Sequence, residues 1–146
     1  MDAVTVMAFD YGLRHIGVAI GNSLIANAKP LAVVSAKNGV ADWQAIEKLL
    51  QEWRPHCLVV GLPLNMDGTD SEMTLRARKF ARQLHGRFAV ECCLLDERLT
   101  SFEAKQNRRE RGEDLDFGRQ TVDAEAACII LQDYWRTKLL ECGNGN

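Results

Sequence analysis

The chain has 146 residues, 47% of them hydrophobic, which is enough for one compact domain to bury its own core. A formal net charge of −2 argues against a protein that coats nucleic acid through its overall charge. The N-terminus shows no secretion signal, no apolar run reaches the roughly 18 residues of a membrane span, and the five cysteines include no C-x-x-C pair. We therefore expect a single cytoplasmic domain at residues 1–140 with reduced cysteines and no membrane contact, followed by a disordered tail at 141–146.

The first part of the chain has the pattern of a β-meander. An apolar run from Val4 to Asp10 is broken at residues 11–14 and resumes from Ile16 to Ile20, which indicates a hairpin. A third strand is predicted within residues 24–34, where Pro30 indicates a bend or an edge position.

Helices and strands alternate after the meander. Trp43, Ile46 and Leu50 recur at helical spacing, which predicts an amphipathic helix over residues 41–53. The apolar residues 57–61 predict a strand that is buried between layers of helices.

A capping-box pattern, Thr69-x-x-Glu72, predicts a second helix that runs to about His85 and ends at Gly86. The next strand is predicted at residues 88–95.

The last third of the chain is predicted to be mainly helical. A second capping box opens a helix over residues 100–111, a polar loop follows at 112–120, and the final helix starts near Thr121. The whole order predicts an α/β fold with a mixed five-stranded sheet, in which a meander of three strands is followed by parallel strands, and with helices on both faces.

Three acidic residues lie where one element gives way to the next: Asp10 and Glu97 at the ends of two strands, and Asp123 at the start of the last helix. Alternation puts Asp10 on the face of Val6 and Ala8, where a charge is costly unless a cation or hydrogen bonds satisfy it. The alternative is an Asp that merely starts an Asp-Tyr-Gly turn.

Asp123 lies on the side of the last helix that carries Ala127 and Ile130 and that must pack on the sheet. A favourable charge in a first helical turn explains its position along the helix, but not this inward side. At the strand end, Asp96 and Glu97 point to opposite faces, so only one of them can join the other acids. Alternation alone does not select between these two, and we favour Glu97.

Three converging carboxylates suit Mg²⁺ or Mn²⁺, which prefer oxygen ligands and keep waters that a phosphate can share. Two such ions would activate a water on one side of a phosphodiester and stabilise the leaving oxygen on the other. The sequence has no His and Cys cluster with zinc-ligand spacing. Asp10, Glu97 and Asp123 are therefore the predicted catalytic residues and metal ligands.

Basic side chains near these acids are candidates for substrate binding. Arg14 and Arg98 lie close to the acids in sequence, and Arg76 and Lys79 belong to a basic run at residues 76–87 that contains no acid. Such local stripes can contact phosphates even in an acidic protein, whereas a solvated helix face is the alternative interpretation.

The loop at residues 61–68 follows a strand at the sheet edge where Asp10 is expected, which is where α/β folds bind ligands. Asn65 in this loop is a further candidate for contact with phosphate or ribose. It is equally typical of an ordinary turn.

Four motifs, in this order, resemble the YqgF (RuvX) family: AFDYGLRHIGVA at residues 8–19, VGLPLNMDG at 60–68, DERLTS at 96–101 and VDAEAA at 122–127. That family resembles the Holliday-junction resolvase RuvC in its RNase H-like fold. Its bacterial members are regarded as nucleases that mature the 5′ end of pre-16S ribosomal RNA. The resemblance therefore implies an RNase H-like domain with an acidic triad at Asp10, Glu97 and Asp123, acting in ribosome biogenesis.

The leading hypothesis is a metal-dependent endonuclease of structured RNA, namely pre-16S rRNA, that is a monomer or a weak homodimer. Branched DNA is the alternative substrate, because the same fold and triad serve both. A non-catalytic nucleic-acid-binding module is a second alternative. A phosphotransferase of the actin and sugar-kinase type also opens with an Asp-x-Gly turn, but it needs two lobes to close over ATP and this chain supplies one.

Overall fold

The structure is a computed structural model that describes residues 3–97 and 116–144. The elements in chain order are β1 (Thr5–Asp10), β2 (His15–Asn22), β3 (Lys29–Lys37), β4 (Val40–Ala41), α1 (Trp43–Trp53), β5 (Cys57–Leu62), α2 (Glu72–Phe88), β6 (Glu91–Asp96) and α4 (Asp116–Asn144). The predicted helix at residues 100–111 lies outside the described residues. Within the described part, no helix is long and apolar enough to cross a membrane.

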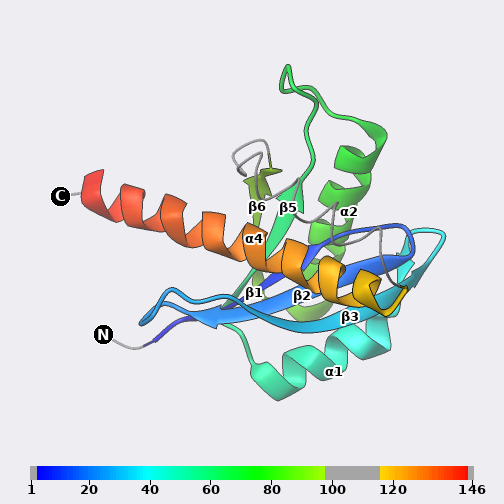
Figure 1. The fold of residues 1–146 in the computed structure, drawn as a ribbon, viewed down its shortest axis with the longest axis horizontal. Helices are drawn as coiled ribbons and strands as arrows, with labels where there is room; N and C mark the ends of the chain where they lie inside the picture. The colour runs from blue at the N-terminus through cyan, green and yellow to red at the C-terminus, as the bar shows by residue number, and fades with distance from the viewer. Residues whose placement is uncertain (1–2, 98–115, 145–146) are drawn as a thin grey trace.

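The strands form one mixed sheet in the order β4-β3-β2-β1-β5-β6 (Figure 1). The meander pairs β1, β2 and β3 antiparallel, and β5 and β6 then join β1 in parallel. The predicted arrangement of five strands is confirmed. The two-residue strand β4 adds a sixth at the β3 edge, and Pro30 coincides with a register shift between β2 and β3.

Helix α1 begins two residues later than predicted. Ala41 belongs to β4 and pairs with Ala36, and the side chain of Asp42 caps the helix by accepting a hydrogen bond from the amide of Ala45 at 3.2 Å. An aspartate at this position satisfies one of the donors that a helix start leaves open.

The start and the end of α2 both differ from the prediction. Its N-cap is Ser71, which forms a capping box with Thr74. Thr69 is not the cap because its hydroxyl donates to Asp67 and accepts from Asn65 within the preceding loop.

The helix also continues through Gly86 to Phe88, and Ala89 ends it in the left-handed conformation. This extra turn brings the ring of Phe88 to 6.2 Å from that of Trp43. Packing on α1 therefore outweighs the helix-ending tendency of a single glycine.

Helix α4 begins at Asp116, about five residues before the predicted start, so residues 116–120 are helical and the prediction of a loop there was wrong. Extending an existing helix is much easier than nucleating one, because each added residue gains a hydrogen bond. The helix also includes residues 141–144, which the sequence had placed in a tail.

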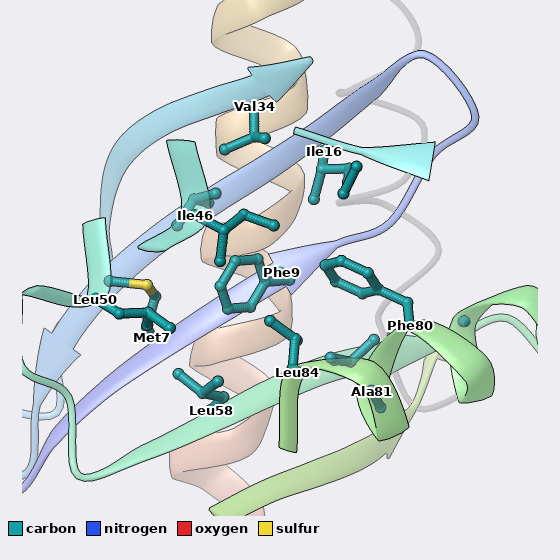
Figure 2. Packing of buried hydrophobic residues seen from close by; sticks show 14 of the residues in the cluster. Met7, Phe9, Ile16, Val34, Ile46, Leu50, Leu58, Phe80, Ala81 and Leu84 are labelled. Atoms are coloured by element: carbon teal, nitrogen blue, oxygen red, sulfur yellow. The ribbon is translucent and has the colours of Figure 1, made fainter. Parts of the chain in front are cut away.

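Two cores lie on opposite faces of the sheet. Met7 and Phe9 of β1 face α1 and α2, where they pack with residues such as Ile46, Phe80 and Leu84 (Figure 2). Val6 and Ala8 of β1 face α4, which crosses the other face of the sheet (Figure 1). Successive side chains of β1 therefore point into different layers, as the alternation of a strand requires.

The described cysteines are free thiols, and Cys57 and Cys128 are buried. This agrees with the prediction of reduced core cysteines. The half-buried Cys92 and Cys93 lie on β6 at the edge of the sheet.

Candidate active site

The candidate site lies at one edge of the sheet. The parallel strands β1, β5 and β6 all end there, and β2, which is antiparallel to β1, begins there. Ligands of α/β folds bind at the carboxyl ends of parallel strands. Asp10 is the last residue of β1, and alternation from Val6 and Ala8 places it on the face that α4 covers.

Asp10 lies between two glycines. Gly17 of β2 is its antiparallel partner, and Gly61 of β5 follows Val60, the parallel partner of Phe9. Neither neighbour has a side chain, so the cross-strand positions on both sides of Asp10 are open to other groups. Glycine inside a strand is typical of such close approaches.

Asp123 approaches through the gap at Gly17. A Cβ atom built on Gly17 would lie only 1.8 Å from the backbone oxygen of Asp123, so the backbone of α4 rests directly on this glycine. The Oδ2 atom of Asp123 is 4.0 Å from Nδ1 of His15, at the start of β2. Asp123 therefore lies on the side of α4 that faces the sheet, as predicted.

Glu97 approaches through the gap at Gly61. A Cβ atom on Gly61 would lie 3.0 Å from Cδ and 3.1 Å from Oε1 of Glu97, and 2.6 Å from Cδ1 of Ile130 on α4. The carboxyl group of Glu97 thus lies on the α4 face of the sheet. Because Leu95 also packs in the α4-side core, alternation sends Asp96 to the opposite face.

The three acids therefore occupy one face of one sheet edge, in the order Asp123, Asp10 and Glu97 across β2, β1 and β5. Their oxygens are the kind of donor that Mg²⁺ and Mn²⁺ prefer. Within residues 3–97 and 116–144, no group of three or more His, Cys, Asp or Glu side chains is gathered as closely as a bound metal requires. The carboxylate oxygens on this face therefore match a hard divalent ion in their chemistry, but the described residues do not form a gathered set of three ligands.

The predicted substrate-binding residues do not form one cluster: three of them line two hollows, and Asn65 lies in the loop after β5. Arg76 and Lys79 of α2 line a hollow of about 180 Å³, and Arg14 lines a neighbouring hollow of about 280 Å³ together with Arg76. Tyr11 lines the first hollow and Leu13 the second, and both residues lie within three positions after Asp10. Arg98 lies outside the described residues.

Asn65 is occupied by its own loop. Its side chain donates to Thr69 Oγ1 at 3.0 Å, its backbone amide donates to the oxygen of Thr69, and Gly68 donates to its backbone oxygen. These bonds shape the loop that follows β5 and match the turn interpretation. Asn65 is also exposed, in the loop that follows β5.

Gly17 and Gly61 are the site residues that sequence reasoning missed. Both were visible as glycines inside or at the end of apolar strands, which is a signal of close backbone approach. What the sequence could not show is that each glycine contacts a different acid from a distant element.

Comparison with known proteins identifies relatives of this chain. Residues 4–137 match the model of the RuvX family, which is described as a Holliday junction resolvase. A relative from Pectobacterium carotovorum, named "Putative pre-16S rRNA nuclease", is 49% identical over 138 residues, covering 94% of this chain and 99% of the relative. A relative of the same name from Azotobacter vinelandii is 52% identical, covering 88% and 91% of the two chains.

Solved structures show the same fold at low sequence identity. Thermus thermophilus RuvC in complex with a Holliday junction substrate superposes with a TM-score of 0.54 at 15% identity, covering 93% of this chain and 96% of that one. The Fowlpox virus resolvase in complex with Holliday junction DNA gives 0.53 at 12% identity, covering 93% and 99%. The predicted RNase H-like fold is confirmed, and the match over residues 4–137, together with these relatives, shows that this chain belongs to the RuvX family.

Proposed function

We propose that this chain is a metal-dependent endonuclease that cleaves structured RNA in the maturation of the 5′ end of pre-16S ribosomal RNA. The nuclease activity is supported by the family match and by relatives about 50% identical that are named as pre-16S rRNA nucleases. The structural observation that carries the proposal is the position of Asp10 between two glycines, with Asp123 and Glu97 each packed on one of them.

In this proposal Asp10, Glu97 and Asp123 hold the metal ions. Asp10 is the central ligand because it lies between the other two acids and ends the strand that both glycines border. Bound divalent ions would supply a nucleophilic water and stabilise the leaving oxygen of a phosphodiester.

The chain itself supplies placement. The contact of the α4 backbone with Gly17 fixes Asp123, and the contact of Glu97 with Gly61 directs that carboxylate toward Asp10. The absence of a Cβ atom at these two glycines is what lets α4 and Glu97 approach the sheet this closely on both sides of Asp10. In this proposal Arg14, which follows Asp10 by four residues and lines a hollow with Arg76, contacts the substrate backbone.

Cleavage of branched DNA is the second candidate, because the structures with this fold include resolvases bound to Holliday junctions. The two candidates share the acids and differ in the substrate. A pre-16S leader RNA and a four-way DNA junction, offered to the same preparation, separate them by their relative cleavage rates.

The test of the acid site uses Asp10→Asn with either substrate, in Mn²⁺ or Mg²⁺. This change keeps the size of the side chain and removes the charge that a metal needs. We expect cleavage to be lost while the thermal unfolding midpoint stays near that of the wild type. Undiminished cleavage would refute the role of Asp10, and metal-independent binding without cleavage by the wild type would favour a non-catalytic module.

A further inference from the structure

Two adjoining hollows, which we call the cationic groove, lie beside the candidate active site on the other face of the sheet. The first hollow, of about 180 Å³, lies between Tyr11, the β3–β4 turn and α2, and the second, of about 280 Å³, continues it toward Arg14. Arg76 and Asn38 line both hollows. The two hollows therefore adjoin at these two residues and together make up the cationic groove.

The groove carries positive charge and no described acidic lining. Its cations are Arg14, Arg76 and Lys79, and no Asp or Glu lines either hollow in the described part of the chain. Arg76 pairs with Glu72 of the same helix at 3.3 Å, but both side chains are well exposed, at 41% and 82%. An exposed pair of this kind is weak, so Arg76 can turn to a phosphate at little cost.

The floor of the groove is aromatic, but its rings are already engaged. Trp43 stacks on Phe80 with ring centroids 5.6 Å apart, and the guanidinium of Arg87 lies 4.4 Å from the Trp43 ring centre. The ring of Tyr11 also packs on Phe80, at 5.0 Å. Because these rings are packed against one another and under Arg87, the groove suits a sugar-phosphate backbone better than stacked bases.

One wall of the groove is held in place by hydrogen bonds. The β3–β4 turn passes through Asn38 and Gly39, both with positive φ, and the hydroxyl of Tyr11 donates to the backbone oxygen of Gly39. The amide of Gly39 donates to the oxygen of Leu13 at 3.0 Å. The turn is thereby tied to the segment that directly follows Asp10, so the groove exists before any ligand binds.

We propose that the cationic groove binds the phosphodiester backbone of a single-stranded RNA segment that flanks the scissile bond. The inference rests on the proposed function, and it adds the path that the RNA takes beyond the scissile phosphate. Asp10 and Tyr11 are consecutive but face opposite layers, so a strand whose phosphate lies at Asp10 needs only to pass over the end of β1 to enter the groove. Hollows of about 180 and 280 Å³ can hold phosphate groups of one strand and are too small to enclose a double helix.

The test measures binding by fluorescence anisotropy, with a fluorescein-labelled single-stranded RNA and the full-length protein in EDTA, where no cleavage occurs. Lys79→Ala and Arg14→Ala are expected to weaken binding by about fivefold each, and to lower the salt slope by about 0.7 for each phosphate that the variant no longer neutralises. The matched control is Arg82→Ala, which removes the same charge from the opposite flank of α2, beside Cys92.

The same binding measurement is repeated with a blunt RNA duplex in place of the single strand. The control variant and this duplex decide the outcome. Wild-type affinity in Arg82→Ala, with weaker binding in Lys79→Ala, supports the groove. Equal weakening in both would mean a general effect of helix charge and would overturn it, as would unchanged binding by Lys79→Ala and Arg14→Ala. Equal weakening for the duplex and the single strand would overturn the single-strand assignment.

The same preparations distinguish failure of the groove from failure of the proposed function. If the wild type cleaves RNA in Mn²⁺ but Lys79→Ala and Arg14→Ala bind as the wild type does, the groove is wrong and the nuclease assignment stands. If the wild type does not cleave but binding weakens in these variants as expected, the nuclease assignment fails and the groove remains as a binding surface for RNA.

Discussion

Replacing Gly17 by alanine tests whether the packing of α4 on β2 places Asp123 in the site. The new methyl group would lie 1.8 Å from the backbone oxygen of Asp123 and 3.1 Å from the amide nitrogen of Ala124. A backbone cannot avoid this clash by rotating a side chain. Restoring even a 3.4 Å contact requires the part of α4 around Asp123 to move by about 1.6 Å.

The magnitude follows from two opposing effects. Overpacking that displaces backbone costs about 3 kcal/mol, and alanine recovers roughly 1 kcal/mol because it restricts the unfolded chain more than glycine does. The net loss of about 2 kcal/mol should lower the thermal midpoint by roughly 6 °C for a chain of this size. Cleavage should fall more steeply, by about 100-fold, because a shift of about 1 Å in a catalytic group has that effect.

The assay combines thermal unfolding with cleavage of pre-16S leader RNA in Mn²⁺. Gly61→Ala serves as a milder companion, because the atoms nearest to its methyl group belong to the side chains of Ile130 and Glu97 and not to backbone. Gly86→Ala is the matched control: nothing lies within 4 Å of its added methyl, so it should stabilise α2 by about 0.5–1 kcal/mol and leave cleavage unchanged. A folded Gly17→Ala that cleaves like the wild type would refute the placement of Asp123 by this contact.

Three further predictions concern stability. Asp42→Ala removes the cap of α1 and should cost about 1 kcal/mol in urea unfolding, whereas Asp42→Asn should cost much less. Trp135→Phe removes the 2.8 Å hydrogen bond from Nε1 to the backbone oxygen of Asn27 and should cost about 1–2 kcal/mol; a neutral result would mean that water replaces the indole. Burial raises the pKa of the Cys92 thiol from 9.0 to about 12, so only the unfolded chain ionises between these values and stability should fall as pH rises from 9 to 12. Cys92→Ala should flatten that part of the pH profile, and an unaltered profile would contradict the assignment to Cys92.

The strand pattern could be predicted from the sequence because its signals are local. Alternation along β1 put Asp10 on the same face as Val6 and Ala8, and the structure shows that α4 covers this face. The buried strand β5 was equally clear, since its whole length is apolar. These features depend on neighbouring residues alone.

The remaining features depend on contacts between distant residues. Ser71 rather than Thr69 caps α2 because the hydroxyl of Thr69 is used by Asp67 and Asn65 in the loop. The placement of Glu97 rather than Asp96 beside the other acids follows from Gly61, which is more than thirty residues away in the chain. Sequence alternation did not select between the two acids. The structure selects Glu97, because its carboxyl group lies against Gly61.

The most direct test of the central claim is a crystal structure of the protein soaked in Mn²⁺, with the ions located by their anomalous scattering. We expect two ions within about 4 Å of each other, held between Asp10, Glu97 and Asp123. The same soak of Asp10→Asn should lose the ions. Ions bound elsewhere, or carboxylates that stay too far apart to share an ion at saturating Mn²⁺, would contradict the account.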